Sequence, residues 1–268
     1  MYQLPVPDNN NTPTAEEPDN RPYVLVYAPR AKFLQPYFER EFSDYRLIFS
    51  AEDAIDALVA DGPIAGAVMV SSTDIYNVTA GELLTEDTPL DLGSVWSARE
   101  KTFSDFCNNL SINGVTLRCA NTVGTGMNGF AMRLARGIAR GTMMHIKGNE
   151  GLISVVHAVD VARYGHLFLQ AINENLTDST VFNITDGVET PVDELINALA
   201  FRIKNKDVFT LKSTRLAKIL YGNELYSDLT RRLTFSNALA QTIAAHFGMS
   251  PHIVTDYLRT HVYDESSL

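Results

Sequence analysis

The chain has 268 residues, of which 45% are hydrophobic and 20% charged, so it is long enough to bury the core of one large α/β domain. Its net charge of -10 excludes nonspecific binding to nucleic acid, which requires clustered Lys and Arg. Cys107 and Cys119 are too few for a disulfide framework, and no Cys/His spacing indicates a metal site. No apolar run reaches the length that crosses a bilayer, so we expect a cytoplasmic protein without a membrane partner.

Strand-like and helix-like segments alternate along the chain. Residues 1–21 are rich in Asn, Pro, Thr and acids, which predicts a disordered tail. The predicted strands are residues 23–27, 46–49, 68–71, 115–118, 143–146, 155–156 and 180–184. The predicted helices are residues 32–42, 51–60, 95–109, 130–140, 159–172 and 191–203. The alternation predicts a Rossmann-like, doubly wound parallel sheet in residues 22–203, and residues 204–268 are predicted to form a small C-terminal helical cap.

Four motifs point to a known family. Residues 67–77, AVMVSSTDIYN, end a predicted strand in two serines, and residues 118–126, RCANTVGTG, follow the next strand with a glycine-containing loop. Residues 156–162, VHAVDVA, open a late helix, and residues 181–187, VFNITDG, contain the last predicted strand. Together they resemble the extended short-chain dehydrogenases, the NAD(P)-dependent epimerase/dehydratase family that acts on nucleotide sugars. The resemblance, which spans about residues 23–203, implies NAD or NADP as cofactor and a possible homodimer.

The same resemblance implies a catalytic set. In the family, a Tyr exchanges a proton with the substrate, a Lys four residues later lowers the pKa of that Tyr, and a Ser hydrogen-bonds the reacting oxygen. Ser72 and Lys101 match the Ser and the Lys, but Ser97 stands at the Tyr position. Trp96 aligns with the Tyr only after a slip of one residue, and indole has no titratable proton in the useful range. The candidate catalytic residues are therefore Ser72, Ser97 and Lys101.

The turn after the first predicted strand, YAPRAKFL at residues 27–34, lacks the glycines of a dinucleotide-binding turn. Pro29 also removes a backbone donor, and Leu34 is bulky where the family has its third glycine. Residues 50–66 fit one helix and no strand, so the adenosine half of the cofactor site is expected to be truncated. The candidate cofactor contacts are Ala28, Arg30, Ala31, Lys101 and Ala120.

The substrate side is also altered. Asn121 matches an Asn that helps to hold substrate in the family. Ile153 stands where many members carry an Arg for the nucleotide diphosphate, and an aliphatic side chain cannot donate to phosphate. His157 matches a position that is usually structural.

Three interpretations follow from the sequence. The first is a divergent sugar epimerase/dehydratase-like protein with degenerate cofactor and catalytic sites and a binding or assembly role. The second is an active NAD(P)-dependent oxidoreductase, epimerase or dehydratase that uses rearranged catalytic groups on a nucleotide sugar or a related small molecule. The third is a relative in fold alone, with an unrelated ligand in the cleft at the strand ends.

Overall fold

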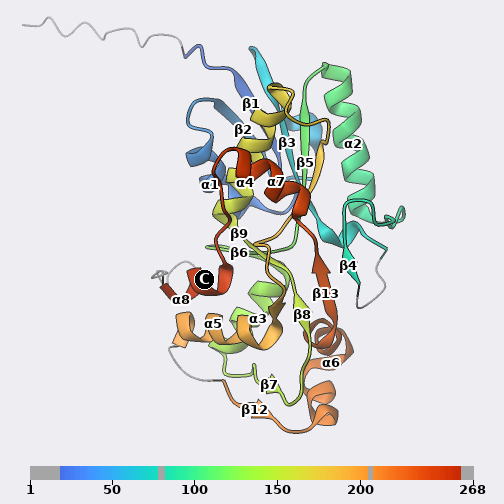
Figure 1. Ribbon diagram of the computed structural model, residues 1–268, viewed down its shortest axis with the longest axis vertical. Coiled ribbons are helices and arrows are strands. Elements are labelled where there is room, and N and C mark those ends of the chain that lie inside the picture. Colours follow the sequence, from blue (N-terminus) through green and yellow to red (C-terminus); the bar gives the residue numbers. More distant parts are fainter. Residues whose placement is uncertain (1–18, 78–81, 205–207, 261–268) are drawn as a thin grey trace, which may run out of the picture.

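The computed structural model describes residues 19–77, 82–204 and 208–260 (Figure 1). Most of the predicted tail, residues 1–18, lies outside this part. A five-stranded parallel sheet with the order β10-β5-β3-β1-β2 forms the upper half of the molecule. Its strands are β1 (Tyr23–Tyr27), β2 (Arg46–Ser50), β3 (Ile64–Ser72), β5 (Gly114–Cys119) and β10 (Val181–Ile184). The predicted α/β class with a parallel sheet is confirmed.

Helices cover both faces of this sheet. They are α1 (Gln35–Glu41) and α4 (Ala158–Asn173) on one face and α2 (Val95–Leu110) on the other (Figure 1). Alternate residues of β1 enter the two cores, because successive side chains of a strand point to opposite faces. Val24 and Val26 belong to the core that contains Phe38 of α1, whereas Leu25 belongs to the core that contains Phe103 of α2.

Helix α2 lies very close to β5. A Cβ atom added to Gly114 would lie 2.6 Å from Sγ of Cys107 and 3.2 Å from the ring of Phe103, so only glycine allows this approach. Cys107 and Cys119 are buried free thiols. Burial raises the pKa of the Cys107 thiol to about 12, so it remains protonated and unreactive at neutral pH.

The segment between β2 and β3 differs from the expected helix at residues 51–60. It forms one short 3-10 turn, η2 (Ile55–Ala57), and residues 51–63 contain no strand. Ile55 and Leu58 are buried against the sheet, so the packing of two side chains overrides the helix propensity of the alanines. In the described part of the chain no strand follows β2 on the outer side, and β3 pairs with the other side of β1.

The lower half of the molecule has its own core (Figure 1). Its helices are α3 (Gly129–Ala139), α5 (Val192–Lys204), α6 (Thr214–Thr230) and α8 (Val254–Thr260). Its short strands are β7 (His145–Ile146) and β12 (Thr210–Leu211), which pair, together with the four-stranded sheet of β4 (Leu83–Leu84), β8 (Leu152–Ile153), β11 (Thr190–Pro191) and β13 (Arg232–Phe235). A further parallel pair, β6 (Asn121–Val123) with β9 (Val155–His157), lies between the halves.

The C-terminal segment, predicted as a helical cap, contains strands β12 and β13 as well as helices, and it packs against both halves of the molecule. Helix α7 (Ala238–His246) packs against α4 and β10, and places Ala240, Ile243 and Ala244 in the core of the main sheet. Helix α8 packs against α5 in the lower half. The boundary after residue 203 stays a prediction. None of the helices in the described residues combines the length and the apolar character needed to span a membrane.

Candidate functional site

A cleft of about 520 Å³ opens at the carboxyl ends of β1, β3 and β5. The chain leaves β1 toward one face of the sheet and β3 toward the other, and ligands of open α/β sheets bind at such a switch point. The upper wall is residues 29–31, 33–34, 70–74 and 119–122. The lower wall is Asn128, Gly129, Phe130 and Arg133 near α3, Asp228 and Arg231 near the end of α6, and Leu233 and Phe235 of β13. The cleft therefore lies between the two halves of the molecule.

The turn after β1 uses most of its own backbone donors. The N–H of Arg30 donates to the carbonyl of Ala51 at 2.8 Å, and the N–H groups of Ala31 and Leu34 donate within the turn at 2.9 Å. Arg30 has φ of 63°, the left-handed region in which glycine is unstrained. Pro29 has no N–H to offer. This turn does not fit a pyrophosphate, which a Rossmann turn holds with free backbone N–H groups.

A second pocket, of about 550 Å³, lies beside this turn and is lined in part by Arg30, Asp53 and Arg99. The carboxylate of Asp53 forms an ion pair with Arg99 of α2 and a longer one, of 3.7 Å, with Arg30. Arg99 is only 7% exposed, and its guanidinium lies 4.6 Å from the ring centre of Trp96. An acidic residue at this end of a Rossmann site binds ribose hydroxyls, but Asp53 already binds Arg99.

Helix α2 turns Trp96 and Glu100 toward the cleft and the sheet. Trp96 lines the central cleft. Glu100 accepts hydrogen bonds from Arg118 of β5, with Nη2 at 2.8 Å from Oε2 and Nε at 3.0 Å from Oε1. The hydroxyl of Ser71 also donates to Glu100, at 2.7 Å. Glu100 is therefore held by two elements of the sheet and is not free to move a proton to a ligand.

The same network continues below Arg118. Its guanidinium donates to Oη of Tyr76 at 3.2 Å, and the phenol of Tyr76 donates to Oδ1 of Asn183 at 2.5 Å. The backbone N–H of Asn183 donates to Glu86 at 2.8 Å. Burial raises the pKa of the Tyr76 phenol, so Tyr76 remains a protonated donor. These groups bind one another, whereas the buried Nδ2 of Asn183 has no hydrogen-bond partner among the described residues.

The predicted catalytic residues do not come together. Ser72 lines the central cleft, where its Oγ accepts the N–H of Asp74 at 3.1 Å. Ser97 and Lys101 line a third pocket, of about 510 Å³, together with Glu100 and Phe103 of the same helix. The hydroxyl of Ser97 donates to the carbonyl of Asp91 at 2.7 Å. Lys101 is 76% exposed and forms an ion pair with Asp105 at 2.6 Å.

The predicted cofactor and substrate contacts are divided in the same way. Arg30, Ala31, Ala120 and Asn121 line the central cleft, and Asn121 donates to the carbonyl of Ser154 at 3.2 Å. Ala28 is fully buried in the core. Sequence reasoning did not select Phe33, Arg133 and Arg231, which line the central cleft, or Arg99 and Glu100, which line the second and third pockets. The apolar stripe of α2 is the sequence signal that indicates Trp96 and Glu100. Trp96 lies seven residues, or about two helical turns, before Phe103, and Glu100 lies seven residues before Cys107, so all four share the buried face.

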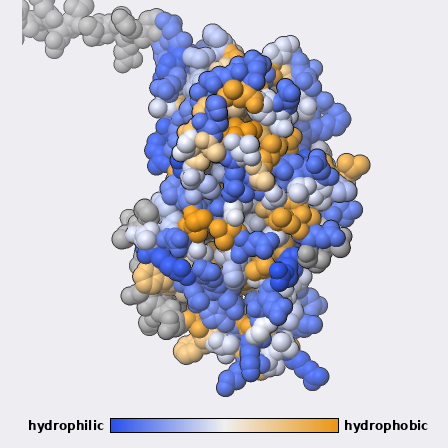
Figure 2. All heavy atoms as spheres, viewed as in Figure 1, coloured by the Kyte–Doolittle hydropathy of each residue, from blue (hydrophilic) through white to orange (hydrophobic). Residues whose placement is uncertain are grey.

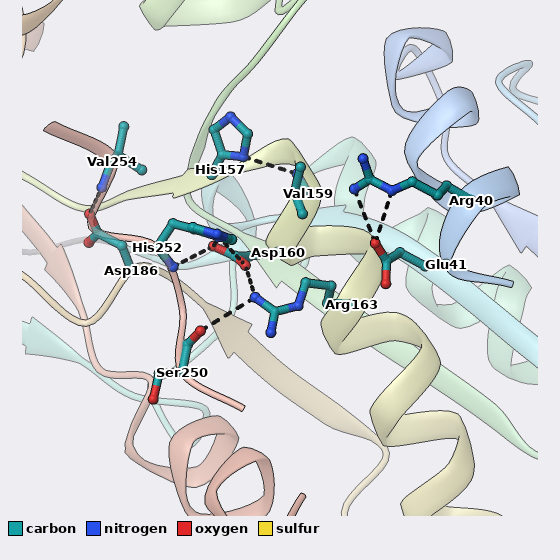
Figure 3. Close-up of polar contacts among 10 residues, drawn as sticks. All are labelled: Arg40, Glu41, His157, Val159, Asp160, Arg163, Asp186, Ser250, His252 and Val254. Carbon is teal, nitrogen blue, oxygen red and sulfur yellow. Dashed lines mark hydrogen bonds and ion pairs between the residues drawn. The ribbon is translucent and has the colours of Figure 1, made fainter. Parts of the chain in front are cut away.

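Polar groups at the start of α4 hold the C-terminal segment (Figure 3). His157 caps α4, because its Nδ1 accepts the N–H of Val159 at 3.3 Å. Asp160 is fully buried, accepts the backbone N–H of His252 at 2.7 Å and lies 2.9 Å from its ring Nδ1. Asp186, after β10, accepts the N–H of Val254 at 3.1 Å. Two buried carboxylates thus fix the start of α8.

Solved structures resemble this arrangement, although no family model and no curated protein matches the sequence. A human epimerase family protein with NADPH aligns with 88% of this chain and 98% of its own, at a TM-score of 0.61 and 12% identity. UDP-glucose 4-epimerase of Thermotoga maritima with UDP-glucose aligns with 88% of this chain and 96% of its own, at a TM-score of 0.59 and 14% identity. UDP-glucose 4-epimerase of Thermus thermophilus with NAD aligns with 90% of this chain and 100% of its own, at a TM-score of 0.56 and 16% identity.

The chain has the NAD(P)-dependent epimerase/dehydratase fold. The predicted fold is confirmed, and at identities of 12–16% the resemblance to these structures is one of fold. Within the epimerase fold, the central cleft lies at the switch point that Rossmann sheets use for their ligands. The turn at residues 28–34 and the pairing of Asp53 with Arg99 are features of this chain that do not fit a dinucleotide bound in the usual way.

Proposed function

We propose that this protein binds a small molecule in its central cleft and does not perform the hydride and proton transfers of NAD(P)-dependent epimerases and dehydratases. The observation that carries the proposal is the inward face of α2. Trp96 stands at the cleft, where indole offers no titratable proton, and Glu100 is held by Arg118 and Ser71. The described lining of the cleft contains no Tyr, His or Lys, and of its two carboxylates Asp228 is paired with Arg133 and Arg231.

The other end of the cleft supports the same conclusion. The human and Thermus thermophilus neighbours are crystallised with NADPH and NAD. In this chain, the turn amides of Arg30 and Ala31 are already bonded, and the Asp53 carboxylate is paired with Arg99. A dinucleotide would have to break these contacts to bind here. This favours the degenerate interpretation over an active enzyme with rearranged groups.

The cleft retains the character of a binding site. Its volume is within the range of about 300–1,000 Å³ that small-molecule pockets occupy. Trp96, Phe130 and Phe235 supply apolar surface, and Ser72 and Asn121 supply polar groups. The possible homodimer stays a prediction. Phe103 and Phe106 of α2, which would form part of an interface by analogy with the family, pack in the core of this chain.

Trp96 provides the test, because it is the only Trp of the chain and it lines the cleft. Titration with NAD, NADH, NADP and NADPH should leave Trp96 emission and the melting temperature unchanged, apart from absorption by the nucleotides. The same titration with nucleosides, sugar phosphates and aromatic carboxylates should find a ligand that changes the emission. A rise in melting temperature of several degrees with any dinucleotide at millimolar concentration would overturn the proposal.

A further inference from the structure

One end of the molecule carries a surface that is both basic and apolar. This basic–apolar patch consists of residues on either side of β12 and in the first half of α6, namely Phe209, Lys212, Arg215, Leu216, Lys218, Ile219 and Leu220. Phe209 is 84% exposed and Ile219 is 80% exposed, and Leu216 and Leu220 are at least half exposed. These elements form the lower tip of the molecule, where hydrophobic and hydrophilic side chains are mixed (Figure 1 and Figure 2).

The fold holds this helix with its apolar side chains directed outward. Ala217 is fully buried in the lower core. The hydroxyl of Tyr221, one turn later, accepts the N–H of Met144 at 2.8 Å and donates to the carbonyl of the same residue at 3.0 Å. Gly222 then breaks the helix with φ of 70°. Ala217 and Tyr221 therefore fix one face of the helix, and the opposite face remains in solvent.

The charge of the patch is opposite to that of the molecule. Residues 208–220 contain Lys212, Arg215 and Lys218, all exposed, and no acidic residue, in a chain of net charge -10. The acids Glu224 and Asp228 follow only after the break at Gly222, and both form ion pairs with Arg133. The first half of α6 is therefore a local positive surface.

We propose that the basic–apolar patch docks this protein on the surface of an anionic lipid bilayer. Basic side chains next to protruding aliphatic and aromatic ones are the combination that binds such an interface, through charge and shallow insertion. Binding to nucleic acid depends chiefly on neutralising phosphates with clustered basic groups, which a chain of net charge -10 does not favour. The three clefts described above, in which a peptide could lie, are lined by other residues. The expectation of no membrane partner rested on the lack of a spanning segment, and docking on a bilayer surface needs no such segment.

The test is co-sedimentation of the full-length protein with vesicles. Phosphatidylcholine vesicles should leave it in the supernatant, and vesicles with about one-third phosphatidylglycerol should pellet it at low salt, with weaker binding at physiological salt. Binding that is equal for the two compositions, or absent from both, would overturn the proposal. The proposal would also be overturned if the protein binds no vesicles but forms a dimer in solution that the Ile219→Asn variant does not form. The patch would then bind a second copy of the chain.

Matched variants separate the patch from the rest of the surface. Arg215→Glu should reduce vesicle binding about tenfold, because it removes one positive charge and adds one negative charge at the membrane. Ile219→Asn should reduce it about fivefold. The controls are Arg40→Glu on α1 and Leu92→Asn, at a side chain that is 84% exposed outside the patch. Both variants should bind vesicles as the wild type does. Unchanged melting temperatures establish folding. Equal losses in the controls would contradict a role for the patch.

Discussion

The carboxylate of Glu100 lies 2.8 Å from the guanidinium of Arg118, and this ion pair joins helix α2 to strand β5. The side chains are 12% and 7% exposed. Buried pairs of this kind add little net stability when intact, but removal of one partner leaves a buried, uncompensated charge. The pair therefore constrains the position of α2 strongly.

Glu100→Ala should lower the free energy of unfolding by about 3 kcal/mol, because Arg118 would remain buried without its carboxylate. Its neighbour provides the control. Lys101→Ala removes only an exposed pair with Asp105 and should change stability by less than about 0.5 kcal/mol. Urea denaturation of both variants checks the prediction, and similar losses for the two would contradict it.

Arg99→Ala should change the environment of Trp96, because the guanidinium of Arg99 stacks on that ring and binds Asp53. We expect a red shift of Trp96 emission as water enters the second pocket. Arg40→Ala, which removes an exposed ion pair on α1, is the matched control. An emission spectrum of the Arg99 variant that matches wild type would show that this contact does not shield Trp96.

Gly114→Ala should destabilise the fold by about 1–3 kcal/mol, because the added Cβ would clash with Cys107 and crowd Phe103. The double variant Gly114→Ala/Cys107→Ala should recover part of that loss, since the second change removes the Sγ atom at 2.6 Å. A thermodynamic cycle from chemical denaturation measures the coupling. Strict additivity of the two changes would contradict the close approach of α2 to β5.

Asp186→Asn should alter the pH dependence of stability. Burial, with a smaller contribution from the charge of Asp160, raises the pKa of Asp186 from 3.8 to about 6. The folded protein therefore binds this proton more tightly than the unfolded chain does. The ionised carboxylate costs stability above about pH 6, and this cost disappears as the pH falls toward 4.

The amide of the Asp186→Asn variant carries no such charge, so the variant should gain stability relative to the wild type as the pH rises from 4 to 7, by on the order of 2 kcal/mol. Denaturation at pH 4 and pH 7 measures how the difference in the free energy of unfolding between variant and wild type changes with pH. The altered hydrogen bonds to Val254 and Val188 shift this difference equally at both pH values. A difference that is constant with pH would refute the assignment.

The longer helices and strands were predictable because each contains enough residues to show the spacing of apolar side chains that is typical of its kind. The sequence alone predicts β1 at residues 23–27 and α2 to within one residue of its bounds. The helix expected at residues 51–60 does not form, since Ile55 and Leu58 pack as one turn. Strands of two residues, such as β4 and β8, have too few side chains to show any alternation.

The site was harder to predict because a helix turns by about 100° per residue. The motif spacing assigns Ser97 and Lys101, and a slip of one residue brings Trp96 and Glu100 inward instead. The spacing of the motif alone does not separate these registers, whereas the apolar stripe of α2, Phe103 and Cys107, does. Tertiary packing selects one of them, because Phe103 must enter the core beneath α2.

The direct pairing of β3 with β1 leaves β2 at the border of the sheet, and in the described part of the chain no strand pairs with its outer side. Its sequence, RLIFS, is apolar in the middle, and its outward backbone groups form a template for another strand. At the opposite border, the Glu86 carboxylate covers the N–H of Asn183. Arg46, at the start of β2, is the one charge within that strand that opposes pairing. Association of partly folded chains during refolding should therefore begin at residues 46–50.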